Sequence, residues 1–381
     1  MSVGSVTVSQ VNNMQGEFKQ LERTFLYVGK SDSDKNKDKI LTITAQSDLD
    51  DLLGSGDSDL KTNLKEAIVN SRDDNFFAYA LPIASDATWK EKALEALDKP
   101  NDLNVEAVVV ITPITKKDDA TSAQFFAYAV MSKYAKFVTV MLCCEGIKID
   151  SATEADNETW SDYTARVKGL IVDVAADRVA VVPQLHGNNL GVVCGRLNDC
   201  GVSIADTPMR VKTGALIGLG PNPVDKDSVE LNMGHLKDLS DQRFSVPQYY
   251  NGYDGWYWAD HHLLDVEAGD FLVYENRRIL DYLARRVRII AIGKIGDRAL
   301  NNTSKSIAVN KIDFARPLRE ASKGFEIAGK EFPGMIKPPE ENAIDIVWQS
   351  RTEVNIAITA TPFECPKSIK LWLALDLNTI Q

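Results

Sequence analysis

The sequence predicts an α/β fold with a mainly parallel sheet, and three observations lead to that prediction. Apolar, β-branched runs alternate with helical windows between about residues 20 and 220. Some runs, such as Val-Val-Val-Ile at 108–111, are continuous, which is typical of strands buried on both faces. The chain has 381 residues, of which 44% are hydrophobic and 25% charged, an ordinary globular composition. Two or three domains are expected at this length.

The elements of this region follow from their residue patterns. Runs rich in Val, Ile and aromatic residues indicate strands, and windows with a 3.6-residue apolar period indicate helices. Asp119 or Thr121 could cap the third helix, and Asn157 or Thr159 the fourth. The expected strands are Phe25–Val28, Ile40–Thr44, Phe76–Leu81, Val105–Thr112, Phe137–Leu142, Val179–Gln184 and Ala215–Gly218. The expected helices are 58–70, 88–98, 121–135, 158–175 and 188–199.

The pattern changes after the Pro-Asn-Pro at 221–223. Aromatic residues crowd 241–262, and helices are expected at about 270–290 and 304–323. Strand-like alternation returns at Glu353–Ala360 and at Ile369–Leu377, and it is also present at residues 3–11. Both ends of the chain therefore read as amphipathic β-strands.

Motifs for enzymatic chemistry are incomplete. Gly29-Lys30-Ser31 follows a strand as in a phosphate-binding loop, but Thr24 stands where that motif needs glycine. Asp260-His261-His262 has no accompanying histidine pair or paired Cys-x-x-Cys that would complete a metal site. We therefore expect no catalytic residues, no metal and no cofactor. Five cysteines, an odd number in a long chain, are expected to be reduced thiols of a cytosol-made protein.

Charge is unevenly distributed along the chain. The net charge is −11, which disfavours direct nucleic-acid binding. Separately, no apolar run is long enough for membrane insertion. Residues 277–319, however, contain 11 Lys and Arg but three Asp. One expected helix holds Arg277, Arg278, Arg285 and Arg286 beside a core stripe. These arginines are either solvated side chains flanking the core or a docking surface for an acidic protein.

Several stretches resemble the tail sheath proteins of contractile bacteriophages, in the branch found in Mu-like and related prophage tails. They run in order along nearly the whole chain and are densest after residue 240. They are Glu22–Gly29, Asp57–Lys61, Phe244–Pro247, Gly252–Trp258, Asn276–Asp281, Phe314–Arg319, Ala343–Trp348, Thr361–Phe363 and Leu375–Leu377.

The resemblance implies a conserved inner α+β domain formed by both termini, with an outer α/β domain inserted between them. In this chain, residues 1–20 form an N-terminal strand arm, 21–234 the inserted outer domain, and 235–381 the inner domain with a C-terminal arm. In this family the arms add strands to the sheets of neighbouring subunits. The arm residues are then Val3, Val6, Val8, Val11, Ile369, Leu371, Leu373, Leu375 and Leu377.

The implied function is mechanical and not enzymatic. Subunits would stack as six-fold rings around an inner tail tube and contract to drive the tube through the target envelope. The implied partners are further copies of the chain, the tail tube protein, and baseplate and tail terminator proteins. Arg277, Arg278, Arg285 and Arg286 are the expected tube contacts, with the segment 304–323 as an alternative. The location would be the virion, after synthesis in the bacterial host cytoplasm.

Two alternatives remain on the sequence alone. One is another virion component, such as a baseplate or capsid protein, and the other is a metabolite-binding α/β enzyme. Long hollow cylinders in negative-stain micrographs would separate a sheath from both.

Overall fold

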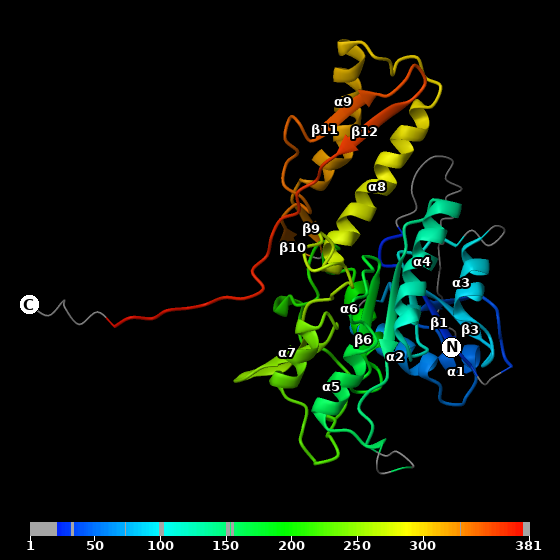
Figure 1. Cartoon of the computed structure of the whole chain (residues 1–381), viewed down its shortest axis with the longest axis vertical. Coiled ribbons are helices and arrows are strands. Elements are labelled where there is room, and N and C mark those ends of the chain that lie inside the picture. Colours follow the sequence, from blue (N-terminus) through cyan, green and yellow to red (C-terminus); the bar gives the residue numbers. More distant parts are fainter. Residues whose placement is uncertain are drawn as a thin grey trace, which may run out of the picture.

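Six strands form one mainly parallel sheet in the first half of the chain (Figure 1). The computed structural model describes residues 21–31, 34–72, 74–98, 103–149, 153, 156–327 and 329–375. The strand order is β2-β3-β1-β4-β5-β6, in which β2 runs antiparallel to β3 and the other neighbours are parallel. This confirms the predicted sheet. The strands are β1 (Phe25–Lys30), β2 (Leu41–Thr44), β3 (Phe77–Ile83), β4 (Ala107–Val110), β5 (Thr139–Cys144) and β6 (Val179–Pro183).

Helices cover both faces of this sheet because successive strand side chains point to opposite sides. Leu26 and Val28 face one core, whereas Phe25 and Tyr27 face the other. The first core is shared with α3 (Trp89–Leu97), α4 (Lys117–Tyr134) and α5 (Trp160–Lys168). The second is shared with α1 (Leu49–Leu53), α2 (Asp59–Ser71) and α6 (Asn189–Asn198). The result is a three-layer α/β/α sandwich.

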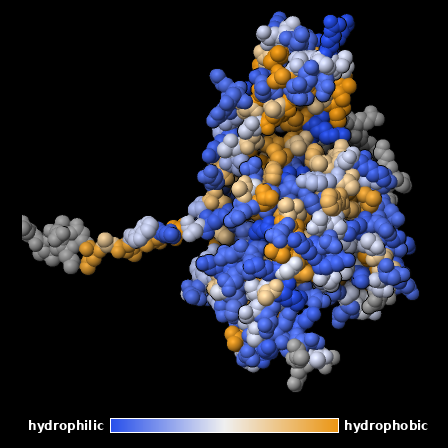
Figure 2. Space-filling view, in the orientation of Figure 1, coloured by the Kyte–Doolittle hydropathy of each residue, from blue (hydrophilic) through white to orange (hydrophobic). Residues whose placement is uncertain are grey.

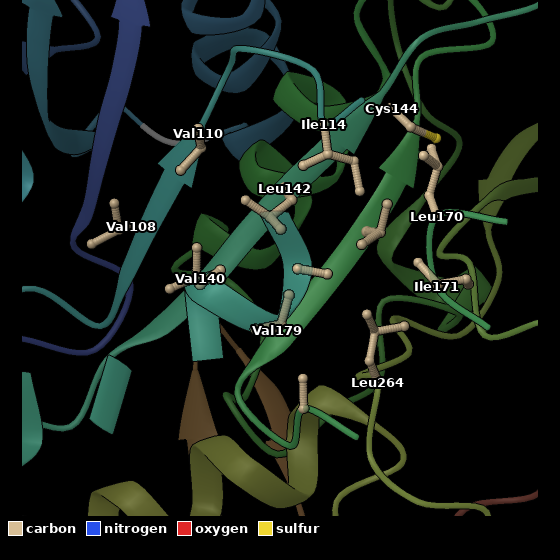
Figure 3. Packing of buried hydrophobic residues seen from close by; sticks show 14 of the residues in the cluster. Val108, Val110, Ile114, Val140, Leu142, Cys144, Leu170, Ile171, Val179 and Leu264 are labelled. Atoms are coloured by element: carbon tan, nitrogen blue, oxygen red, sulfur yellow. The ribbon is translucent and has the colours of Figure 1, made fainter. Parts of the chain in front are cut away.

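The first core is made largely of branched aliphatic side chains. Figure 3 shows Val108 and Val110 of β4 beside Val140 and Leu142 of β5. Leu264, from far along the chain, lies in the same cluster. Burying a side chain of this size contributes about 1.5–3 kcal/mol, so the continuous apolar runs seen in the sequence are the main stabilising feature of the sheet.

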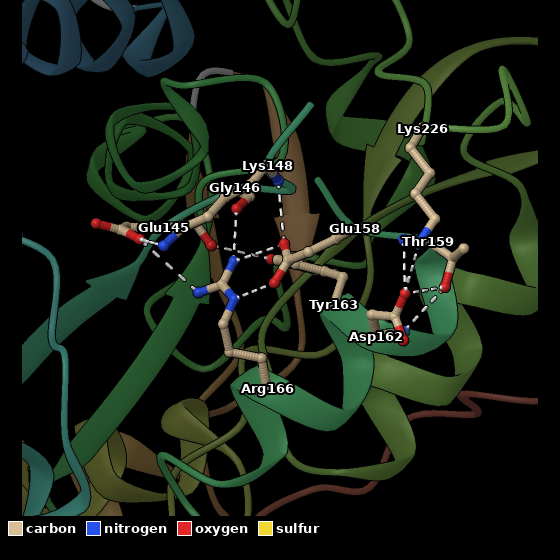
Figure 4. Close-up of polar contacts among 9 residues, drawn as sticks. All are labelled: Glu145, Gly146, Lys148, Glu158, Thr159, Asp162, Tyr163, Arg166 and Lys226. Atoms are coloured by element: carbon tan, nitrogen blue, oxygen red, sulfur yellow. Dashed lines mark hydrogen bonds and ion pairs between the residues drawn. The ribbon is translucent and has the colours of Figure 1, made fainter. Parts of the chain in front are cut away.

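A polar network fixes the loop after β5. Arg166 of α5 donates from Nε to Glu158 Oε1 (2.5 Å) and from Nη2 to the Gly146 carbonyl (2.9 Å), as Figure 4 shows. Thr159 caps α5, since its side chain accepts from the backbone of Asp162 and the Asp162 carboxylate accepts in return. Thr159 is one of the two residues that the sequence predicts as possible caps of this helix, and in the structure it is the N-cap.

Residues 204–264 pack on the sandwich as an irregular layer. They include the 3₁₀ turn η2 (Val211–Thr213), helix α7 (Met233–Asp241) and the antiparallel hairpin of β7 (Pro247–Tyr250) and β8 (Tyr253–Trp258). Leu236, Leu239 and Phe244 are buried in the first core. This places the start of the expected inner domain against the α/β sandwich.

The expected strand Ala215–Gly218 is wrong. Gly214 and Gly218 adopt positive φ values of 100° and 81°, which strand geometry does not allow. The backbone is held instead by isolated hydrogen bonds. Leu216 N donates to the Trp256 carbonyl (2.7 Å), and Ile217 N donates to Asn70 Oδ1 (3.0 Å). The apolar run is therefore an extended loop pinned to its neighbours.

A second, smaller unit stands on the sandwich (Figure 1). Its long helix, α8 (Tyr274–Lys294), begins at the sandwich, and α9 (Ser304–Ala321) packs beside it. Two antiparallel pairs complete it: β9 (Phe325–Ile327) with β10 (Lys330–Phe332), and β11 (Ile344–Trp348) with β12 (Val354–Ile358). Two small clusters of buried residues, around Leu318 and around Phe314, form its core.

The chain then leaves the body as an extended segment (Figure 1). Residues 369–375 pair with no strand in the described part of the chain. Residues 1–20, with the expected arm Val3–Val11, lie outside the described residues, and so does Leu377.

Candidate functional site

The basic helix α8 is fastened to the sandwich by buried ion pairs. Arg278 donates from Nε and Nη2 to the two oxygens of Glu106, at 2.5 and 3.1 Å. Arg178, the residue just before β6, donates two hydrogen bonds to the Asp281 carboxylate of α8, both at 2.8 Å. Paired bonds of this geometry between guanidinium and carboxylate are among the strongest polar contacts in proteins.

The other predicted arginines also face carboxylates within the chain. Arg277 is paired with Asp177, and its guanidinium lies 3.4 Å from the centre of the Phe271 ring. Arg285 Nη2 lies 2.9 Å from Glu22 Oε1, and Arg286 Nη1 lies 3.4 Å from the same oxygen. Arg277, Arg278 and Arg285 are buried, and Arg286 is half-buried.

These buried ion pairs join parts of the same chain, so the arginines have a structural role within the subunit. Desolvation alone would raise the pKa of the Glu106 carboxyl, but the Arg278 cation holds that pKa below its ordinary value. Neither sequence interpretation, solvated arginines or a docking surface, foresaw this arrangement. Tube contact by Arg277, Arg278, Arg285 and Arg286 stays a prediction, and the burial of three of them argues against it.

Helix α9, the alternative segment, presents exposed cations. Lys305, Arg316 and Arg319 of this helix are exposed, and so is Lys323 just after it. Val309 and Ile312 are exposed on the same helix, at 51% and 56% of their surface. A shallow hollow of about 280 Å³ is lined by Ile312, Asp313, Arg316, Arg319, Glu320 and Lys323. This face combines positive charge with apolar surface.

The C-terminal segment presents an apolar row to solvent. Ile369, Leu371, Leu373 and Leu375 are 72–99% exposed, as is Trp372 between them at 85%. Figure 2 shows this apolar segment standing clear of the body. Isolated exposed leucines are common, but a continuous apolar stretch marks a contact surface.

The β11–β12 pair is a sheet with open edges in the described part of the chain. Five residue pairs join its strands, from Ile344 with Ile358 to Trp348 with Val354. Ile344 and Ile346 are buried against α8 and α9, so one face is fixed. The outer edge of each strand therefore carries backbone groups that a further strand could pair with.

The histidine and cysteine candidates lie in structural surroundings. His261 is fully buried, with Nδ1 2.6 Å from Ser245 Oγ, and burial lowers the pKa of its ring from 6.5 to about 3. Cys143, Cys144 and Cys194 are buried thiols whose pKa values are raised by desolvation. The described residues contain no group of three or more His, Cys, Asp or Glu that could hold a metal ion.

None of the helices in the described ranges combines the length and apolarity that a bilayer crossing requires.

Two family models cover most of the chain. Residues 3–262 match the family described as DUF2586, N-terminal domain, and residues 270–378 match DUF2586, C-terminal domain. The protein assigned as the tail sheath protein of Haemophilus phage HP1 (strain HP1c1) is 40% identical over 380 residues. That match covers 99% of each chain.

Solved contractile machines have the same fold. The contracted sheath complex of the extracellular contractile injection system PVC matches with a TM-score of 0.60 and 12% identity, covering 99% of this chain and 98% of that one. The contracted helical sheath of the anti-feeding prophage matches with a TM-score of 0.58 and 13% identity, covering 99% and 100%. At such identities the likeness shows the fold alone, whereas the full-length match at 40% identity shows descent. The chain therefore belongs to the tail sheath protein family.

Proposed function

We propose that this chain is the repeating subunit of a contractile sheath. Subunits would stack as six-fold rings around a tail tube and contract to push the tube through the target envelope. One observation carries the proposal: the apolar row Ile369, Leu371, Leu373 and Leu375 has no partner in the described part of its own chain. A second copy is the partner that a helical polymer provides.

Strand addition would bury this apolar row and would supply hydrogen-bond partners for an open edge of the β11–β12 sheet. An extended segment that joins a sheet edge gains backbone hydrogen bonds and buries alternate side chains. Each buried Leu or Ile contributes roughly 1.5–3 kcal/mol, which must exceed the cost of ordering the segment. Four such residues give enough for a stable link. The N-terminal residues Val3–Val11 are proposed to form a second link of the same kind.

The tube contact is proposed to lie on α9. Its exposed Lys305, Arg316 and Arg319 suit an acidic tube surface better than the paired arginines of α8. Each exposed ion pair contributes only about 0–1 kcal/mol. Contacts of this strength, repeated around a ring, would hold a tube before contraction and release it during contraction.

The subunit is proposed to move as one body during contraction. Four guanidinium–carboxylate contacts tie α8 to the sandwich, namely those of Arg277, Arg278, Arg178 and Arg285. Rotation between subunits would then be absorbed by the arms. Baseplate and tail terminator proteins would bound the polymer, with no direct nucleic-acid contact and no membrane insertion.

The division into an arm (1–20), an outer domain (21–234) and an inner domain (235–381) is part of the proposal. The packing of Leu236, Leu239 and Phe244 on the sandwich favours a later outer boundary. The gap between the two family models, at residues 263–269, favours the same position.

Truncation of the arms tests the proposal. Deletion of residues 1–12 or 368–381 should leave a folded, soluble protein but abolish tubes in negative-stain micrographs. The full chain, purified in the same way, is the control and should form long hollow cylinders. Normal tubes from both truncated proteins would contradict strand exchange. Discrete particles from the full chain would favour another virion component.

A further inference from the structure

The side chain of Lys367 fastens the root of the C-terminal segment to the body. Lys367 Nζ lies 2.7 Å from Asp260 Oδ1 and 2.8 Å from Glu275 Oε1. The hydrogen bonds and ion pairs found for the described residues 364–375 all belong to Lys367. Asp260 follows β8, and Glu275 lies in the first turn of α8. One ammonium group therefore joins the segment to both parts of the body.

Lys367 supplies the positive charge next to these two carboxylates. Glu275 is buried, and its Oε2 has no hydrogen-bond partner in the described part of the chain. Burial raises the pKa of the Glu275 carboxyl, and Lys367 opposes that rise while Asp260 adds to it. Without Lys367, two acidic groups would face each other with little solvent. The released state thus costs free energy, and the contact recloses when nothing pulls on it.

The ion pair lies over a hollow at the foot of the segment. A cavity of about 840 Å³ is lined by residues of the 203–211 loop, the start of α8, and the segment itself. Cys365, Lys367 and Ile369 all line it. The segment can therefore separate from the body here without disturbing a packed core.

The preceding attachment lies four residues earlier. Phe363 N donates to the Met335 carbonyl (3.4 Å), and Lys337 N donates to the Thr361 carbonyl (2.7 Å). With the Lys367 contact closed, the free arm begins at residue 368; with it open, the arm begins at 364. An extended chain spans 3.3–3.6 Å per residue, so opening lengthens the arm by about 13 Å.

We propose that Lys367 is a releasable latch that sets the reach of the C-terminal arm. The inference rests on the proposed function, because reach matters only if the arm pairs with a neighbouring copy. The Lys367 side chain is 31% exposed, so water can replace its partners as the contact breaks. When subunits rotate apart, the latch yields before the backbone pairing of the arm does.

Native Cys365 provides a reporter inside the latched stretch. Cys143, Cys144 and Cys194 are buried, and Cys200→Ser removes the remaining half-buried thiol. A spin label on Cys365 and a second on Val69→Cys, an exposed position of α2, give one distance by pulsed electron resonance on the dilute full-length protein. We expect a single narrow distance in this background.

The variants separate the latch from general effects on the segment. Lys367→Met should replace the narrow distance by a broad distribution, whereas Lys370→Met, the matched change three residues on, should not. Lys367→Arg, which keeps a cation that can reach both Asp260 and Glu275, should keep the narrow distance. Circular dichroism and the urea midpoint confirm folding of each variant.

The outcomes of the two proposals are distinguishable. A narrow distance in Lys367→Met, or a broad one in the background protein, overturns the latch whatever micrographs show. Absence of tubes from the unlabelled full chain overturns the sheath proposal while leaving the distance result intact.

Discussion

His261 is fully buried, and burial favours the neutral form of its ring in the folded protein. Ser245 Oγ lies 2.6 Å from its Nδ1 and also accepts from Trp258 Nε1 at 2.8 Å. Burial lowers the pKa of His261 from 6.5 to about 3, and the positive charge of Arg278 and the neighbouring His262 add to the effect. Below pH 6.5 the unfolded chain therefore binds a proton that the folded chain does not, so stability falls as the pH falls from 6.5 toward 3.

We expect the free energy of unfolding to drop by about 2 kcal/mol through this residue between pH 7 and pH 5. Urea titrations at the two pH values measure it. His261→Asn keeps a nitrogen that can hydrogen-bond to Ser245 but removes the titrating ring. The free energy of unfolding of this variant should therefore differ less between the two pH values. His235→Asn, at a half-exposed position, should keep most of the wild-type difference. Equal pH dependence in His261→Asn and wild type would contradict the assignment.

Helix α8 is positioned by its ion pairs, and one carboxylate tests this. Glu106→Gln leaves Arg278 buried without its counter-ion, which should lower the free energy of unfolding by about 3–5 kcal/mol. Asp51→Asn, which breaks the exposed pair with Lys35, should change it by about 0–1 kcal/mol. Urea midpoints of both variants give the comparison. A loss in Glu106→Gln no larger than that of the control would mean that α8 is held by apolar packing instead.

Elements with a strong local pattern could be predicted, and those set by tertiary contacts could not. The predicted strands Phe25–Val28 and Val179–Gln184 end within two residues of β1 and β6, because their apolar runs are continuous. Ala215–Gly218 shares that composition, but flanking glycines with positive φ turn it into a loop. The sequence pattern does not predict helix α7, because the helix is short and its signal is little more than the Asn232 cap with Leu236 and Leu239.

At the scale of the whole molecule, the sequence could not show which cations are free. Arg278 and Glu106 are 172 residues apart, and Arg285 and Glu22 are 263 apart, so local pattern carries no sign of their pairing. The excess of positive charge in 277–319 has two different consequences in the structure. Its first part fastens α8 inside the subunit, and its second part stays on the surface of α9.

The exposed cations of α9 are the proposed contact with the tail tube. The triple variant Lys305→Glu, Arg316→Glu and Arg319→Glu reverses exposed charges on α9, so the subunit should still fold and form tubes. It should recover far less of a co-expressed tail tube protein in pull-downs, because the acidic partner would now be repelled. Wild-type recovery should also fall as salt is raised, since exposed charges are screened.

The matched control reverses the same number of exposed charges on the sandwich, at Lys65, Lys133 and Lys168. It should recover the tube protein as wild type does, because the outer surface would not face the tube. Reversal of Arg277, Arg278 and Arg285 is not an equivalent test, since it would break the ion pairs that hold α8. Normal recovery by the α9 variant would move the tube contact to another face, whereas equal loss in the control would mean that net charge alone governs binding.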